Sequence, residues 1–151
     1  MINTPNPSIP INTPLSNTPK HFFINLYTLN IRSLNDPMKQ TQLINYLDSQ
    51  HYEIINLTET HFFTYHNTHT FKQHPTYQAI WTLNNSQSHS GIGLLIHKSL
   101  LPFIIRTSQH LERIIIVDLS FKHHKSLRII VVYLPSNNLP LNRDVSNKLS
   151  L

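Results

Sequence analysis

The sequence contains no cysteine, and this absence excludes several classes of protein at once. Without thiols there is no disulfide framework, no cysteine-ligated zinc and no thiol nucleophile. Glycine is also scarce, with 2 residues in a chain of 151, so we expect asparagine and serine to form many turns. A dinucleotide-binding loop is not expected, because no third glycine follows Gly91 and Gly93 and the next residues read as a strand.

Charged residues and long apolar runs are scarce as well. Charged side chains make up only 13% of the chain, about half of the usual ~25%. The net charge of +5 comes from scattered cations, which is compatible with a phosphate-bearing partner but does not identify one. No apolar run approaches the ~18 residues of a membrane span, and residues 1–20 do not resemble a secretion signal. We expect an intracellular protein without a membrane partner, nuclear or cytoplasmic; its oligomeric state is left open.

The chain divides into a leader and a globular part. Residues 1–20 repeat Asn-Thr-Pro and are expected to be disordered, because proline interrupts both helices and strand ladders. Residues 21–151 have apolar runs at regular spacing, and the composition, 39% hydrophobic, is compatible with one packed core.

The globular part begins with a βαβ pattern. Phe22–Asn30 and Glu53–Thr58 read as strands, and between them Asn35 or Asp36 precedes Pro37 as the cap of a helix. The strands then lie parallel through a right-handed crossover, which predicts an α/β fold. The helical residues expected to face the core are Met38, Leu43, Ile44 and Leu47.

Strands dominate the rest of the sequence. His123-His124-Lys125 is expected at a hairpin tip, and a further helix is expected from Asn142 onwards. The predicted strands are Tyr77–Leu83, Gly93–His97, Phe103–Arg106, Ile114–Ser120 and Leu127–Tyr133.

Three polar residues lie at or near the ends of predicted strands. Asn30 ends the first strand, Glu59 follows the second, and Tyr133 ends the last. A carboxylate, an amide and a phenol are suited to binding Mg²⁺ and a phosphodiester. The competing interpretation is that all three are ordinary solvated residues, since most carboxylates are simply exposed. A zinc site is a weaker alternative, because the histidines lack a standard zinc spacing; they are His61, His66, His69 and His74.

Five segments occur in an order that resembles a known family. They are Asn30–Leu34, Leu57–His61, Gly91–Ile96, the Glu112-Arg113 pair and Val131–Pro135. Together they resemble the endonuclease/exonuclease/phosphatase superfamily with the DNase I-like fold, and most closely the apurinic-endonuclease-like domain of non-LTR retrotransposons. The resemblance implies a four-layer α/β/β/α sandwich, with a mixed sheet, and Mg²⁺-dependent hydrolysis of DNA. It also implies that Glu59 binds the metal, that Asn30 is the active-site asparagine and that Tyr133 contacts the phosphate.

The sequence departs from this family in two ways. Arg32 stands where some members have an acidic residue, and the chain has neither a Gly-Asp-Phe-Asn-like segment nor a Ser-Asp-His segment. The resemblance therefore covers the amino-terminal half of such a domain, a truncated sandwich without the groups that prepare the attacking water. We expect a catalytically incomplete phosphodiesterase domain with weak metal binding. The alternatives are a non-catalytic nucleic-acid-binding or interaction remnant of a retrotransposon protein, and an unstable relic without a selected role.

Overall fold

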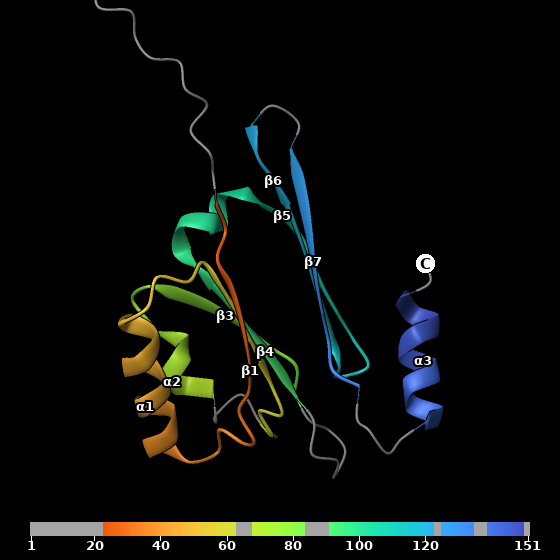
Figure 1. The fold of residues 1–151 in the computed structure, drawn as a ribbon, viewed down its shortest axis with the longest axis horizontal. Coiled ribbons are helices and arrows are strands. Elements are labelled where there is room, and N and C mark those ends of the chain that lie inside the picture. The colour runs from red at the N-terminus through yellow and green to blue at the C-terminus, as the bar shows by residue number, and fades with distance from the viewer. Residues whose placement is uncertain (1–22, 63–67, 84–90, 123–124, 135–138, 150–151) are drawn as a thin grey trace, which may run out of the picture.

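The computed structural model describes residues 23–62, 68–83, 91–122, 125–134 and 139–149 (Figure 1). The predictions for the leader at residues 1–20, for His66 and for the His123-His124 tip lie outside these residues. The side chain of His69 is likewise not described.

The chain begins with the predicted βαβ unit. Strand β1 (Leu26–Asn30) and strand β2 (Ile54–Thr58) pair in parallel, with Asn30 opposite Thr58. Helix α1 (Pro37–Asp48) connects them, and Pro37 occupies its first turn. Of the two predicted caps, Asp36 is the one used, because its side chain accepts a hydrogen bond of 2.9 Å from the Met38 amide.

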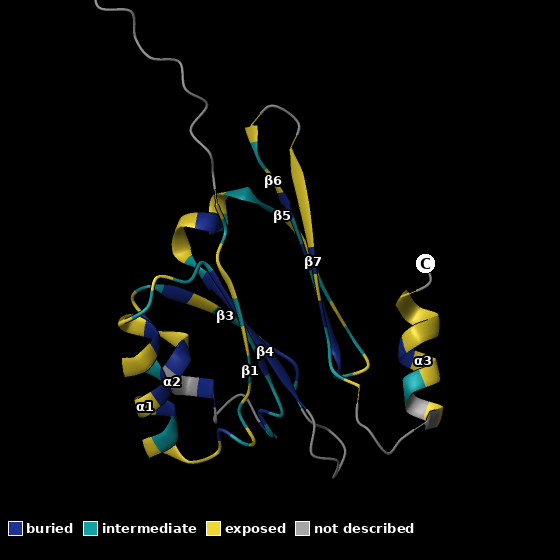
Figure 2. Ribbon diagram, in the orientation of Figure 1, coloured by how far each residue is buried: buried dark blue, intermediate teal, exposed yellow. Residues whose placement is uncertain are grey.

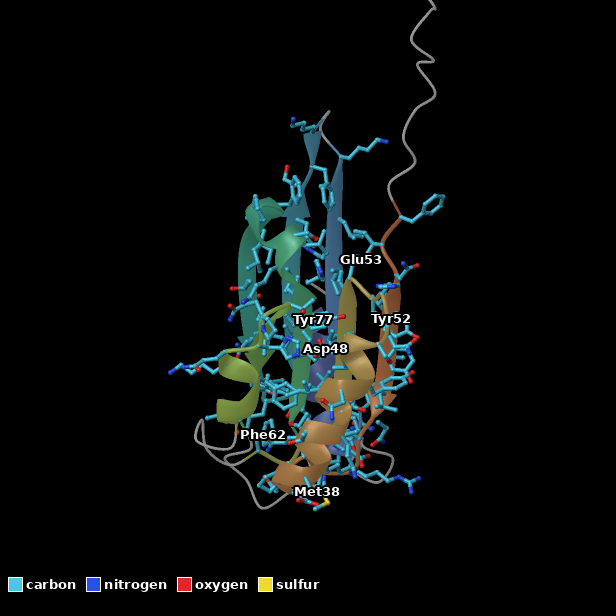
Figure 3. The ribbon with its side chains drawn as sticks, turned by 90° about the vertical axis from the view of Figure 1, so that its left-hand side faces the viewer. Met38, Asp48, Tyr52, Glu53, Phe62 and Tyr77 are labelled. Carbon is cyan, nitrogen blue, oxygen red and sulfur yellow. The ribbon has the colours of Figure 1, made fainter. Side chains whose placement is uncertain are left out.

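The predicted core face of α1 was wrong at one position. Met38 is 69% exposed and projects at the end of the helix (Figure 3), whereas Gln40 is buried together with Leu43 and Leu47. Residues 40, 43 and 47 share one helical face, and Met38 lies on roughly the opposite side of the helix from Leu47. Gln40 tolerates burial because its side-chain amide donates to the Leu34 carbonyl at 2.6 Å.

The first sheet is mixed and has the strand order β1-β2-β4-β3. Strand β4 (Ile92–His97) runs antiparallel to both β2 and β3 (Tyr77–Trp81). The sequence did not predict two short helices beside it, α2 (His69–Lys72) and η2 (Lys98–Phe103). Strand β3 ends at Trp81, earlier than the predicted Leu83.

The second sheet is an antiparallel meander of three strands, followed by a helix. Strand β6 (Ile114–Ser120) has the predicted bounds and pairs with both β5 (Ile104–His110) and β7 (Ser126–Val132). Strand β5 extends beyond the predicted Arg106, and β7 stops just before Tyr133. Helix α3 (Leu139–Leu149) starts earlier than the predicted Asn142.

The two sheets pack face to face and form the centre of the core (Figures 1 and 2). Buried residues such as Ile54 and Leu94 of the first sheet pack against Val117 and Ile129 of the second. The other face of the first sheet is covered by α1 and α2, while α3 lies beyond the second sheet. No described helix is long and apolar enough to cross a membrane.

Candidate active site

Asn30 and Glu59 lie side by side because β1 and β2 are parallel neighbours. Asn30 is the last residue of β1 and Glu59 follows the last residue of β2, so both leave the same edge of the sheet. The side-chain amide of Asn30 donates a hydrogen bond of 2.9 Å to Oε1 of Glu59. The predicted convergence of these two groups is therefore present in the structure.

Tyr133 reaches the same carboxylate from the second sheet. It follows β7, and its hydroxyl donates to Oε1 of Glu59 at 2.9 Å. The three residues selected from the sequence thus form one cluster, in which Glu59 accepts a hydrogen bond from each of the other two. Their chemical roles stay a prediction.

Arg113 packs against Tyr133 and holds its backbone in place. It was not selected as a site residue from the sequence. Its backbone carbonyl accepts a hydrogen bond of 3.0 Å from the Tyr133 amide. Its buried guanidinium carbon lies 5.3 Å from the centre of the Tyr133 ring, a cation–π distance. The Glu112-Arg113 pair contributed to the family resemblance, but this contact depends on how β6 and β7 pair.

The two loops that follow β1 and β2, next to Asn30 and at Glu59, have an unusual backbone conformation. Arg32, Ser33, Glu59 and His61 have φ angles of 49°, 81°, 56° and 58°. Non-glycine residues rarely adopt this left-handed region, and each such residue costs about 1–3 kcal/mol. Hydrogen bonds between the loops hold them there, among them Ser33 N to Glu59 O at 2.7 Å. Strained backbone concentrated in this way is typical of functional sites.

Lys39 and Gly91 complete the support of these loops, and neither role was predicted from the sequence. Lys39 lies in the first turn of α1, and its ammonium donates to the carbonyls of Ile31 at 2.5 Å and Arg32 at 3.2 Å. Gly91 has a φ of 99°, and a Cβ there would lie 2.6 Å from Oγ1 of Thr60. Only glycine therefore fits beside the residue that follows Glu59.

The cluster keeps Glu59 ionised and Tyr133 neutral near pH 7. The hydrogen bond from Asn30 is the main cause that lowers the pKa of Glu59; partial burial opposes it, while Tyr133, His61 and Arg32 add to it. Burial, followed by the bond to Glu59, raises the pKa of Tyr133. Both hydrogen bonds fall on Oε1, and within the described residues none is made to Oε2. Oε2 is therefore available to a cation.

The lowered pKa of Glu59 predicts a pH-dependent contribution to stability. Because the folded-state pKa lies below the usual 4.5, the contribution is complete above pH 4.5 and is lost as the pH falls through the folded value. We expect the stability advantage of the wild type over Glu59→Gln to shrink as the solution is acidified below that point. Urea unfolding of both proteins at several pH values measures this difference, and a constant difference would contradict the assignment.

The described residues contain no group of three or more His, Asp or Glu that could hold a metal. The zinc alternative therefore has no support among the histidines described. His74 is buried: its Nδ1 accepts from the amides of Thr76 at 3.1 Å and Tyr77 at 3.2 Å, and its Nε2 lies 3.4 Å from Asp48. Burial is the main cause that lowers the pKa of His74, which is a structural residue.

No protein-family model and no curated protein matches the sequence. Among solved structures, the chain is similar to the AP endonuclease LMAP from Leishmania major, with 12% identity and a TM-score of 0.56 over 80% of this chain and 42% of that one. It is also similar to the APE2 catalytic domain from Xenopus laevis, with 17% identity and a TM-score of 0.57 over 83% of this chain and 49% of that one.

These similarities concern the fold. The mixed α/β arrangement with its βαβ start matches part of an AP endonuclease fold, which confirms the broad expectation of a DNase I-like architecture. The chain spans less than half the length of either structure. The retrotransposon branch and the use of magnesium stay predictions.

Proposed function

We propose that this chain forms part of a Mg²⁺-dependent DNA phosphodiesterase domain, a truncated four-layer sandwich related to the endonucleases of non-LTR retrotransposons. Asn30, Glu59 and Tyr133 would be its metal-binding and phosphate-binding groups. The observation that carries this proposal is the arrangement around Glu59. Two donors at 2.9 Å fix one carboxylate oxygen and leave the other open at the edge of the sheet.

The chemistry of this site fits Mg²⁺. Magnesium commonly binds through one or two carboxylates and completes its shell with water and substrate phosphate. Glu59 provides one ionised carboxylate with Oε2 available, so we expect weak binding that a phosphate ligand strengthens. When bound, the cation would offset the negative charge of the phosphate.

Asn30 and Tyr133 orient the carboxylate and have capacity left for a ligand. The Asn30 amide has two N–H groups, of which one donates to Glu59, so the other is suited to a phosphate oxygen. The Tyr133 hydroxyl donates to Glu59 and still has an oxygen lone pair for a water molecule. Both groups thus fit roles beside a phosphodiester.

Asp118 is not placed to act as the base for the attacking water. Asp118 is held by Arg128, with distances of 2.6 and 3.0 Å between their side chains, and lies in the middle of β6. A general base must reach the water directly or through one other water. This favours a second candidate function, in which the chain binds nucleic acid through the cluster without hydrolysing it.

A plasmid-nicking assay tests the proposal. We expect any nicking by the wild type to require Mg²⁺ and to disappear in Glu59→Ala, with EDTA as the metal-free control. Nicking that survives in Glu59→Ala would contradict the site assignment. Binding of the plasmid by the wild type without any nicking would favour the second candidate.

A further inference from the structure

Arg32 lies in the loop beside the cluster, and we propose that its guanidinium binds a backbone phosphate of the DNA next to Glu59. This inference rests on the proposed function, because it names a second contact to the ligand of the same site. Arg32 would act as a binding residue that helps to position the phosphodiester.

The backbone of Arg32 is fixed on both sides. Its amide donates to Oδ1 of Asn30 at 3.2 Å, and its carbonyl accepts from the Lys39 ammonium at 3.2 Å. Arg32 has a φ of 49°, a conformation in which glycine or asparagine would be less strained. The loop therefore holds the backbone of Arg32 in a fixed place between Asn30 and the first turn of α1.

Arg32 differs from two other arginines of the chain, one of which is paired with a carboxylate and the other buried. Arg128 forms a salt bridge with Asp118, and Arg113 is buried under the Tyr133 ring. Arg32 is an exposed residue, and no salt bridge to it occurs within the described residues. The next residue along the loop, Ser33, donates its amide to the Glu59 carbonyl at 2.7 Å, so the loop that carries Arg32 lies against the residue that carries the carboxylate. The loop therefore presents a cation beside the carboxylate.

A phosphate is the ligand that this pair of charges fits. An exposed guanidinium on the loop next to Glu59 would add positive charge to that of a metal ion held by the carboxylate, and both would attract an anion. The guanidinium fork matches phosphate oxygens with two parallel hydrogen bonds. A DNA backbone meets both requirements, and the net charge of +5 favours its approach.

If Arg32 had a purely structural role, its replacement by alanine would lower the melting temperature of the protein. The hydrogen bonds that fix this residue come from its backbone, which any replacement except proline retains. Arg32→Ala should therefore keep the melting temperature of the wild type in a circular dichroism melt. Loss of affinity without loss of stability separates a binding residue from a structural one.

The test measures binding of the full chain to a short fluorescein-labelled DNA duplex, by anisotropy over a series of salt concentrations with Mg²⁺ present. We expect Arg32→Ala to bind about tenfold more weakly, and the slope of log affinity against log salt to fall by about one. Arg32→Lys should lose less, because it keeps the charge. Arg106→Ala is the matched control, since Arg106 is an exposed arginine on β5 and its loss should change the affinity little.

Two outcomes overturn the proposal. One is equal affinity of Arg32→Ala and Arg106→Ala for the duplex, and the other is no measurable binding of the duplex by the wild type. Mn²⁺ binding is measured in parallel, so that failure of the Arg32 proposal can be distinguished from failure of the proposed function. Arg32→Ala should retain Mn²⁺ binding, because Glu59 is intact. Wild-type Mn²⁺ binding that does not depend on Glu59 would contradict the proposed function itself.

Discussion

Replacing Glu59 with glutamine is expected to reduce Mn²⁺ affinity by at least about tenfold, because the site loses its one negative charge. Glutamine has nearly the same shape as glutamate, so Asn30 and Tyr133 keep an oxygen to which they can donate. The effect should therefore fall on the metal and leave the fold intact. Electron paramagnetic resonance of free Mn²⁺ measures the affinity, and Mg²⁺ competition shows whether magnesium uses the same site.

Glu53→Gln is the matched control for this experiment. Glu53 precedes β2, so it lies at the opposite end of the same strand (Figure 3), where it accepts a hydrogen bond of 2.7 Å from the Asn25 amide. Both substitutions remove one carboxylate charge from the chain, but only Glu59 has Asn30 and Tyr133 as donors. If both variants lost the same affinity, the metal would be responding to net charge and not to this cluster.

The part of the site that depends only on the order of helices and strands along the chain could be predicted from the sequence. Two apolar strands with a helix between them are parallel neighbours, so the residues that follow them must meet at one edge. This rule is sufficient to bring Asn30 to Glu59. Tyr133 is different, because its contact with Glu59 spans 74 residues and depends on how the two sheets pack. The apolar pattern predicted that Tyr133 lies at the end of a strand, and only the family resemblance implied that it contacts a phosphate.

Other features were beyond prediction because they depend on backbone angles and tertiary contacts. A sequence does not show that Arg32 and Glu59 adopt left-handed φ angles, since neither residue type favours them. In the sequence, Lys39 is one of several scattered cations. Its contacts with the loop carbonyls depend on the position of α1 in the folded protein. Met38 was wrongly assigned to the core because apolar character was given more weight than its angular position on the helix.

Gly93→Ala is expected to destabilise the protein by about 3 kcal/mol, at the upper end of the cost of overpacking a core. Gly93 lies opposite Trp81 in the β3–β4 pair, and the indole ring crosses over it. A Cβ at position 93 would lie 2.0 Å from Cζ3 and 2.4 Å from Cε3 of Trp81. The ring cannot easily move away, because Phe62 and Phe71 pack edge-on against it with centroid distances of 5.0 and 5.1 Å.

A double-mutant cycle identifies the cause of this loss. Trp81→Leu alone should also destabilise, because removal of the ring leaves a cavity in the core on the α1 and α2 side of the sheet. In the Gly93→Ala background the smaller leucine makes room for the new methyl group, so the double variant should lose less than the sum of the two single losses. Urea unfolding of the four proteins measures each free energy. Strict additivity would show that the indole ring is not the obstacle to a methyl group at position 93.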